Sequence, residues 1–293
     1  MSGSDRPVLD GSSDGTSQCA SARVQAPIGR RLLTVAGMDE LGAYRVLRLS
    51  DPSGPRPQPG QFSMLTAAER WGGGEDDRPH VPRAFSVARW QDGEAHYLLE
   101  DVGPGTHRLC ELRGGDEVWV LGPLGRGFTA PAEDQRAILV GGGVGIAPLA
   151  ILQDTFGDHA DTQGTVALLG FRDGAHTRGA SLLRGAQVAT DDGSVGHHGL
   201  VTDLLVRELD ETPRAIVYAC GPAPMLEATR AICGARDVPA QLALESGMAC
   251  GFGACFGCVV PLRDGSYLRV CLDGPVIDAA RLERVDAHAG APA

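Results

Sequence analysis

The sequence predicts a small antiparallel β-barrel, then a parallel α/β sheet, then a cysteine-rich loop near the C-terminal end. The barrel is predicted by short strand-like segments separated by Gly/Pro turns in the first half of the chain. The sheet is predicted by buried strands that alternate with helices in the second half. The loop is predicted by four of the eight cysteines, which fall between residues 245 and 273.

Length and composition fit a globular protein of two domains. The chain has 293 residues, of which 22% are charged and 43% hydrophobic. A net charge of -11 argues against nucleic acid or an anionic membrane as the main partner, because both attract basic patches. The expected segments are a disordered tail over 1–27, a barrel domain over 28–130, an α/β domain over 131–245, a cysteine segment over 246–282 and a tail over 283–293.

Nothing in the sequence predicts export or a membrane span. The first 27 residues are rich in Ser, Gly, Asp and Pro and lack the apolar run of a signal peptide. The long uncharged run over 137–152 contains three adjacent glycines and Pro148, which make it a poor transmembrane helix. We therefore expect a cytoplasmic protein.

Six strands are expected in the first half, where helical periodicity is weak. One helical turn is expected over 106–112, and a surface loop over 71–80. The strands are expected at 31–35, 44–49, 61–65, 84–88, 96–100 and 117–121.

The motif Arg83-Ala84-Phe85-Ser86 falls at the strand expected over 84–88. An arginine can bind a pyrophosphate through two hydrogen bonds, and an aromatic ring can pack on a flat cofactor ring. Residues of a strand alternate between its faces, so Arg83 and Phe85 share one face and Ser86 takes the other. The alternative is an edge strand with an exposed arginine, and the motif alone does not decide between them.

A glycine-rich turn follows the buried strand expected over 136–140. It runs Gly141-Gly142-Gly143-Val144-Gly145-Ile146-Ala147-Pro148 and leads into an apolar helix over 149–153. A strand, a glycine turn and a helix form a common site for the phosphates of a dinucleotide. The spacing departs from the usual G-x-G-x-x-G pattern, because Ile146 or Pro148 stands where the third glycine belongs.

Strands and helices continue to alternate after this turn. A second turn, Cys220-Gly221-Pro222, follows the strand expected over 215–219. Open α/β sheets bind ligands at the carboxyl ends of their strands, so the two turns together favour a dinucleotide site. Further strands are expected at 165–170, 187–189 and 241–245, the last completing the sheet, and helices at 200–209 and 226–233.

The cysteine segment opens with Cys250, Cys255 and Cys258 in the spacing C-x4-C-x2-C, and Cys271 follows after twelve residues. Plant-type 2Fe-2S sites open with this spacing, and four thiolates hold their two irons. The glycines between the cysteines let the backbone curl and direct N–H groups at the sulfurs. The alternatives are a structural zinc site, which usually has two short pairs of ligands, and disulfides, which would close strained loops here.

The order of these features resembles the ferredoxin reductase superfamily over about residues 28–282. The end of the chain carries a more specific resemblance. The segments MACGFGACFGC (248–258) and VCLDGPV (270–276) resemble the electron-transfer subunits of the two-subunit, NAD-linked (class 1B) dihydroorotate dehydrogenases.

The resemblance implies that FAD binds across the barrel and that NAD binds to the α/β sheet. Arg83 would bind the FAD pyrophosphate, Phe85 would pack on the flavin or its ribityl chain, and Ser86 would lie near the reactive flavin nitrogen. The same resemblance implies that Ala84, Gly105 and Thr106 also contact FAD and that Gly60, Gln61 and Phe62 form the strand entry before the flavin motif. It implies that NAD binds at Gly141, Gly142, Gly143, Gly145 and Pro148, with Cys220, Gly221 and Pro222 beside the nicotinamide. The cysteines implied to bind a 2Fe-2S cluster are Cys250, Cys255, Cys258 and Cys271.

The resemblance also implies a partner. An FMN-containing dehydrogenase subunit would oxidise dihydroorotate in de novo pyrimidine (UMP) biosynthesis, in a heterotetramer with two copies of each subunit. Electrons would pass singly through the cluster to FAD, and FAD would reduce NAD by hydride transfer. This chain has no room for a (β/α)8 substrate barrel of about 250 residues, so it would not oxidise dihydroorotate alone.

Several points stay open in the sequence. Arg172 could pair with the 2′-phosphate of NADP, whereas the adjacent Asp173 could favour the free ribose of NAD, which the family favours. The insertion over 67–81 and the bulky Phe252 and Phe256 depart from the family pattern. The alternative functions are an NAD(P)H-dependent flavin and iron-sulfur reductase serving a ferredoxin, a hydrogenase or an oxygenase, and a non-enzymatic zinc-stabilised binding module.

Some conspicuous residues are expected to have no chemical role. His197 and His198 are expected in a solvated loop, because adjacent residues rarely bind one metal. Glu245 is either a plain strand-end carboxylate or a residue beside the flavin. The cysteines expected to be small buried side chains or tail residues are Cys19, Cys110 and Cys233.

Overall fold

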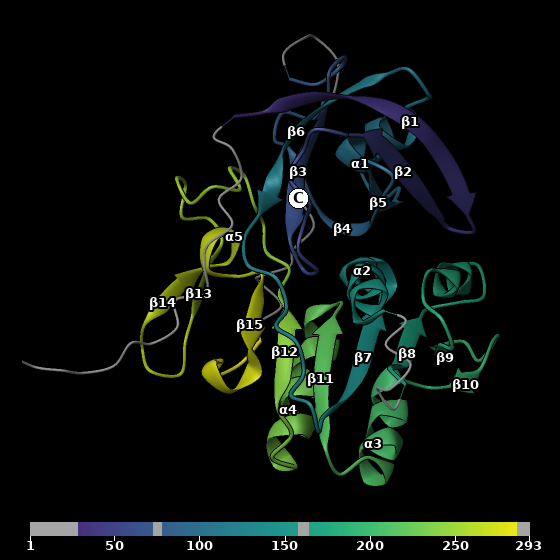
Figure 1. Cartoon of the computed structure of the whole chain (residues 1–293), viewed down its shortest axis with the longest axis vertical. Coiled ribbons are helices and arrows are strands. Elements are labelled where there is room, and N and C mark those ends of the chain that lie inside the picture. The colour runs from purple at the N-terminus through teal and green to yellow at the C-terminus, as the bar shows by residue number, and fades with distance from the viewer. Residues whose placement is uncertain (1–28, 73–77, 158–163, 286–293) are drawn as a thin grey trace, which may run out of the picture.

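The computed structural model describes residues 29–72, 78–157 and 164–285. It confirms the predicted fold class, with a barrel, an α/β sheet and a C-terminal cysteine segment (Figure 1). Four predicted features lie wholly or partly outside the described residues: the tail over 1–27, Cys19, the loop over 71–80 and the tail over 283–293.

Six antiparallel strands close the barrel, and each overlaps a predicted strand. They are β1 (Arg31–Leu41), β2 (Tyr44–Ser50), β3 (Phe62–Ala67), β4 (Arg83–Gln91), β5 (Glu94–Glu100) and β6 (Glu117–Leu124). Their order around the barrel is β1-β2-β5-β4-β3-β6. Inward-facing leucines such as Leu47, Leu65 and Leu99 are completely buried and fill the barrel core. The short helix α1 (Pro104–Cys110) begins before the predicted turn, because Pro104 already has the backbone φ of a first helical turn.

A seven-stranded sheet forms the second half of the chain. Its strands are β7 (Arg136–Gly142), β8 (Val166–Phe171), β9 (Gln187–Thr190), β10 (His197–His198), β11 (Ala215–Cys220), β12 (Ala240–Ala243) and β15 (Val276–Asp278). The order is β10-β9-β8-β7-β11-β12-β15, and every neighbouring pair is parallel except β12 with β15.

Helices cover both faces of this sheet, as a parallel sheet requires. Helix α2 (Ala147–Phe156) packs on the face that includes Leu139. Helices α3 (Val201–Glu211) and α4 (Ala223–Ala235) pack on the opposite face, with Ile138 and Val140. Alternate residues of β7 face opposite helix layers, so the apolar residues of this one strand pack into both hydrophobic cores.

Two predictions about this half are wrong in detail, and one element was missed. The strand expected over 241–245 does not complete the sheet, because β15 pairs antiparallel beyond it. His197 and His198 form β10 and not a loop. A 3₁₀ helix (His176–Leu182) was not predicted. Each feature is too short for hydrophobic periodicity to mark it.

The cysteine segment packs against both the barrel and the sheet. It contains the hairpin β13 (Val259–Pro261) and β14 (Tyr267–Arg269), the short helix α5 (Val270–Asp273) and then β15, which lie side by side in Figure 1. Cys258 and Cys271 share one apolar core with Phe62 and Met64 of β3 and with Leu242 of β12. The segment is therefore held in place by the two other parts of the fold.

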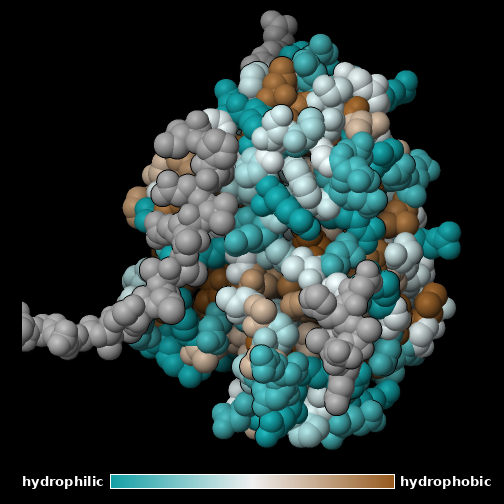
Figure 2. All heavy atoms as spheres, in the orientation of Figure 1, coloured by the Kyte–Doolittle hydropathy of each residue, from teal (hydrophilic) through white to brown (hydrophobic). Residues whose placement is uncertain are grey.

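Most large apolar side chains lie in three buried clusters. Figure 2 shows one face of the molecule, which is mostly hydrophilic, with apolar residues in small separate patches. Over the residues that the structure describes, no helix is both long enough and apolar enough to cross a membrane.

Candidate functional site

The arginine motif lies inside the barrel wall on β4. Along the motif β4 pairs with β3, and its pairing with β5 begins only at Val87, so one side of the motif is left unpaired as in the edge-strand alternative. Arg83 itself is half-buried and not fully exposed. Phe85 packs against the barrel core, whereas Ala84 is exposed and Ser86 is half-buried. Arg83 donates from Nη1 to the Val81 carbonyl at 2.6 Å, and partial burial lowers the pKa of its guanidinium. A partly dehydrated cation of this kind is suited to an anionic ligand.

The second segment expected to contact FAD, at Gly105 and Thr106, touches this arginine. Gly105 is buried, and it lies so close to Arg83 that a Cβ atom at this position would clash with Arg83 Nε. Thr106 Oγ1 accepts hydrogen bonds from the N–H groups of Val102 at 2.9 Å and Gly103 at 3.0 Å, so this hydroxyl stabilises its own turn. The structure thus brings the two segments together, and any side chain at position 105 would displace that of Arg83.

Trp71 lies against the same arginine, which sequence reasoning missed. The Arg83 Cζ atom lies 5.9 Å from the centre of the Trp71 ring, within the range of a cation–π contact. The ring also packs against the barrel core. The available signal was a large aromatic residue in a loop otherwise rich in glycine and charge.

Gly60, Gln61 and Phe62 form the junction between the barrel and the rest of the molecule. Gln61 Nε2 donates to the Gly125 carbonyl at 2.9 Å, and a Cβ atom on Gly60 would lie 2.7 Å from Val276 of β15. Phe62 is buried in the core shared with the cysteine segment. These residues therefore fix how the barrel meets the sheet.

The glycine-rich turn and the Cys220-Gly221-Pro222 turn meet at the carboxyl ends of β7 and β11. Gly141 is in register with Cys220, and a Cβ atom on Gly145 would clash with the Cys220 carbonyl. A Cβ atom on Gly142 would lie 2.9 Å from Pro222 Cδ. The two backbones can approach this closely only because these positions are glycines.

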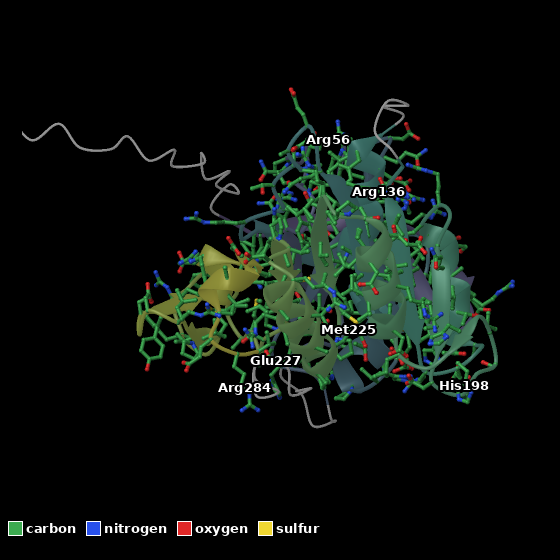
Figure 3. All side chains as sticks on the ribbon, turned by 90° about the horizontal axis from the view of Figure 1, so that it is seen from below. Arg56, Arg136, His198, Met225, Glu227 and Arg284 are labelled. Carbon is green, nitrogen blue, oxygen red and sulfur yellow. The ribbon has the colours of Figure 1, made fainter. Side chains whose placement is uncertain are left out.

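The remaining residues of the two turns complete the same contact. Gly143 has a φ of +54°, in the left-handed region that favours glycine, and Pro148 is buried in the first turn of α2. A Cβ atom on Gly221 would lie 2.7 Å from Cε of Met225, which Figure 3 labels on α4. The two turns and α4 thus form one packed edge beside the glycines.

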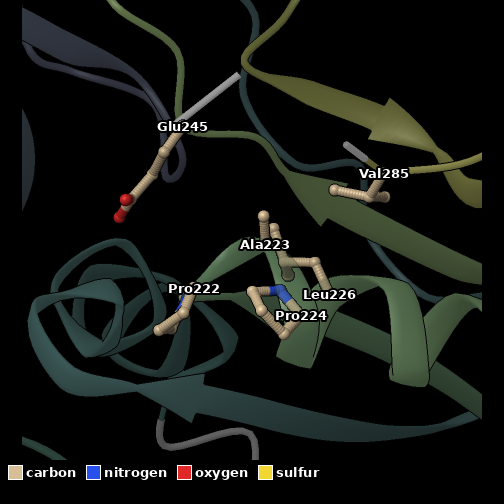
Figure 4. A pocket seen from close by; sticks show the side chains of 7 residues that line it. Pro222, Ala223, Pro224, Leu226, Glu245 and Val285 are labelled. Atoms are coloured by element: carbon tan, nitrogen blue, oxygen red, sulfur yellow. The ribbon is translucent and has the colours of Figure 1, made fainter. Parts of the chain in front are cut away.

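A pocket of about 230 Å³ opens beside this edge. In Figure 4 the Glu245 carboxylate extends over the pocket on the side of Pro222. Solvent reaches Glu245, yet protein surrounds much of its carboxyl, and the incomplete hydration raises its pKa. Burial, and secondarily the charge of Glu245, raises the pKa of the Cys220 thiol. The pocket is lined by Gly221, Pro222, Ala223, Pro224, Leu226, Glu245 and Val285.

The four cysteines expected to bind a cluster form two pairs. Cys258 Sγ and Cys271 Sγ lie 3.2 Å apart, and both residues are buried. Cys250 and Cys255 are hydrogen-bonded neighbours, and Cys255 is exposed. Burial and the contact with Cys258 raise the pKa of the Cys271 thiol to about 12. Within the described parts of the chain, no three His, Cys, Asp or Glu side chains gather around one metal position.

Backbone amides of the cysteine loop point at Cys250. Burial alone would raise the pKa of this thiol, but the N–H groups of Cys255, Phe252 and Ala254 donate to its sulfur and lower the pKa to about 7. The predicted N–H donors are therefore present at this sulfur. They stabilise its thiolate form, which is the form that binds metals.

The cysteine loop lies directly on the barrel strand next to the arginine motif. Gly251 has a φ of +77°, and a Cβ atom there would lie 2.9 Å from Met64 Sδ. Met64 is on β3, in register with Ala84 of the arginine motif. A single strand therefore separates the cysteine loop from that motif.

Arg172, the residue that left NAD and NADP undecided, is bound by the barrel. Its Nη2 atom pairs with Glu100 at the end of β5, and its Nε atom lies 3.0 Å from His176 Nε2. His176 Nδ1 lies 2.7 Å from Asp173 Oδ1, and this hydrogen bond lowers the pKa of the Asp173 carboxyl. Two carboxylates thus accompany the one guanidinium.

The residues expected to have no chemical role behave largely as expected. Cys110 and Cys233 are buried, which raises the pKa of their thiols to about 11 and about 12. His197 Nε2 lies 3.1 Å from Asp203 Oδ2, at the start of α3.

Known proteins resemble this chain along most of its length. Residues 245–283 match a family model described as the iron-sulfur cluster binding domain of dihydroorotate dehydrogenase B. The electron transfer subunit of dihydroorotate dehydrogenase B (NAD(+)) from Caldanaerobacter subterraneus subsp. tengcongensis is 38% identical over 227 residues, which cover 76% of this chain and 86% of that subunit. The subunit of the same name from Geobacillus kaustophilus is 38% identical over 267 residues, 87% of this chain and 99% of that one.

A solved structure shares the architecture as well. The NADH-dependent reduced ferredoxin–NADP oxidoreductase superposes with a TM-score of 0.71 and 25% sequence identity. The superposition covers 88% of this chain and 92% of that one. The likeness therefore extends over the barrel, the sheet and the cysteine segment together.

Proposed function

The chain belongs to the family of electron transfer subunits of the NAD-dependent dihydroorotate dehydrogenase B, and we propose that it binds FAD, a 2Fe-2S cluster and NAD in one redox chain. It is thus the electron-transferring subunit of an oxidoreductase, and its C-terminal segment is an iron-sulfur cluster binding domain. The cofactor-binding residues within this fold are the proposal.

The residues around Arg83 fit the pyrophosphate of FAD. The guanidinium is partly dehydrated, and Gly105 keeps the neighbouring backbone within contact distance of it. Phe85 and Trp71 supply aromatic surface on the same part of the barrel. A bound FAD would supply the exchange between single electrons and hydride, and the chain would hold and orient it.

The cysteine segment fits a cluster with two irons. Each iron of a 2Fe-2S cluster takes two protein thiolates, and the chain offers two thiol pairs, Cys250 with Cys255 and Cys258 with Cys271. A single zinc ion needs four ligands around one point, so the paired arrangement favours iron over the zinc alternative. The amides directed at Cys250 favour its thiolate form.

The two glycine turns fit a dinucleotide. They meet at the carboxyl ends of β7 and β11, and the first leads into α2, whose N-terminal N–H groups favour a phosphate. The pocket beside Cys220 and Glu245 would take the nicotinamide end. Glu100 and Asp173 already pair with Arg172, so these two carboxylates would repel the negative charge of a 2′-phosphate. This supports NAD over NADP.

We propose that the FMN-containing dehydrogenase subunit covers the outer side of the cysteine segment, in an assembly with two copies of each subunit. This segment exposes Phe252 (56%), Phe256 (61%) and Tyr267 (70%) to solvent. Aromatic residues are enriched at protein interfaces and rarely exposed together without a reason. We also propose a cytoplasmic setting, because the thiolates of a cluster must stay reduced.

The contact between the cysteine loop and β3 is the observation that carries the proposal. Only Met64 and its strand lie between Gly251 of that loop and Ala84 of the arginine motif, which brings the two proposed redox sites together. Electrons from a partner subunit would enter at the cysteine segment and leave as hydride on NAD.

Quantitation of iron, sulfide and flavin on the purified chain tests this. The proposal expects two irons, two sulfides and one FAD per chain, as the 2Fe-2S cluster contains two of each element. Cys255→Ser should remove the cluster and leave FAD bound, because the arginine motif does not involve the cysteines. Zinc without flavin, or loss of both cofactors in Cys255→Ser, would contradict the proposal.

A further inference from the structure

Arg269 connects the two turns of the cysteine loop. Its Nη1 atom donates to the Gly253 carbonyl at 3.3 Å, and its Cζ atom lies 5.0 Å from the centre of the Phe256 ring. Gly253 belongs to the turn between Cys250 and Cys255, and Phe256 to the turn between Cys255 and Cys258. One guanidinium therefore contacts both turns that present the first three cysteines.

Phe256 adopts a backbone conformation that needs support. Its φ of +57° lies in the left-handed region, which bulky side chains rarely adopt. Such a conformation persists only where surrounding contacts stabilise it. The stacking of Arg269 on the Phe256 ring is a contact of this kind.

The backbone of Arg269 is itself held firmly. Its N–H group donates to Asp273 Oδ2 at 3.1 Å, and its Cα is in register with Val259 in the β13–β14 hairpin. The next residue, Val270, donates from its N–H group to the Cys258 carbonyl at 3.0 Å. The side chain is half-buried. The positive charge is therefore held against the loop that carries the first three cysteines.

Gly253 is required at its position by its backbone conformation and by Leu272. Its φ is +83°, and a Cβ atom there would clash with Leu272, while it would lie 3.4 Å from Arg269 Nη1, in ordinary contact. A glycine adopts this φ without strain, and in this conformation the Gly253 carbonyl accepts the hydrogen bond from Arg269.

We propose that Arg269 is a positioning residue that holds the cysteine loop closed, and that its fixed charge raises the reduction potential of the cluster. The inference rests on the proposed cluster at these four cysteines. Reduction adds one negative charge to the cluster, so a nearby fixed cation stabilises the reduced state more than the oxidised state. The same cation also offsets the negative charge of Asp273, which binds its backbone.

Three variants of the purified, cofactor-loaded chain test the inference. Arg269→Met removes the charge and both contacts, whereas Arg269→Lys keeps the charge but loses the planar group that reaches both turns. Arg263→Met is the matched control, because Arg263 lies in the same segment and bonds the Leu282 carbonyl at 3.5 Å and not the cysteine loop. The readout is the cluster midpoint potential from an EPR-monitored redox titration, with iron and sulfide measured on the same samples.

We expect Arg269→Met to retain iron and to lower the equilibrium constant for cluster reduction about tenfold, which is a fall of ~59 mV in the midpoint potential of a one-electron couple. Arg269→Lys should show a smaller fall, and Arg263→Met should match the unmodified chain. A full cluster at an unchanged potential in Arg269→Met, or equal falls in Arg269→Met and Arg263→Met, would overturn the inference.

Two further outcomes separate the inference from the proposed function. If Arg269→Met binds no iron, the lysine variant decides: a bound cluster at or slightly below the unmodified potential supports the inference, and a fall of ~59 mV or more despite the retained charge refutes it. If the unmodified chain itself binds no iron, the proposed cluster is wrong, and the inference fails with it.

Discussion

Replacing Gly251 by alanine should disrupt the packing of the cysteine loop against the barrel strand β3. The Cβ atom would lie 2.9 Å from Met64 Sδ and 3.2 Å from Leu124 Cδ1, and would overlap Met64 Cγ. Overpacking of this kind costs about 1–3 kcal/mol. The φ of +77° adds about 1–2 kcal/mol for a residue with a side chain. The free energy of unfolding should therefore fall by about 2–5 kcal/mol.

Gly265→Ala separates these two effects. Gly265 lies in the same segment with a φ of +79°, but a Cβ atom there has no neighbour within 4 Å. It should lose only the backbone part, about 1–2 kcal/mol. The assays are denaturant unfolding of both variants, together with iron, sulfide and FAD per chain. Gly251→Ala should bind less iron while retaining FAD; equal unfolding energies and iron contents in the two variants would refute this account of the packing.

Three further predictions concern the other sites. Gly105→Ala should weaken FAD binding about tenfold or more, ~1.4 kcal/mol, because the new Cβ atom displaces the Arg83 guanidinium, and fluorescence titration of the FAD-free chain measures this. Glu245→Gln should raise the free energy of unfolding at pH 8, because incomplete hydration raises the pKa of the Glu245 carboxyl and its ionised form therefore disfavours folding. The gain should fall as the pH drops below the raised pKa and disappear below the unfolded-state pKa, and an equal gain at all pH values would contradict this. Glu100→Gln should release Arg172 from its ion pair with the barrel. The ratio of kcat/KM for NADPH to that for NADH should then rise about fivefold, ~1 kcal/mol, in a dye-reduction assay. An unchanged ratio would show that Arg172 does not contact the nucleotide.

The sequence predicted most of the architecture because its signals are local and recur along the chain. Short strand-like segments between Gly/Pro turns indicate the barrel, and the run over 136–140 is apolar on both faces, as a covered parallel strand requires. β15 has three residues and follows Gly274-Pro275, so no periodicity could identify it. Its pairing with β12 depends on the tertiary position of the whole cysteine segment.

The candidate residues were predictable as motifs, but their contacts were not. Spacing alone grouped Cys250, Cys255 and Cys258, whereas the pairing of Cys258 with Cys271 needs the β13–β14 hairpin to bring them together. Arg172 looked available for a 2′-phosphate, because the sequence cannot show that Glu100 of the barrel reaches it. Contacts between segments far apart in the chain are set by packing, which a local pattern does not encode.

The most direct test mixes the anaerobic purified chain with NADH and follows flavin absorbance and the EPR spectrum of rapidly frozen samples. Flavin absorbance should fall first, and the signal of a reduced 2Fe-2S cluster should then appear. Cys255→Ser should show the loss of flavin absorbance without that signal. Flavin reduction that never produces a cluster signal in the unmodified chain would contradict the claim that this subunit links the two redox sites.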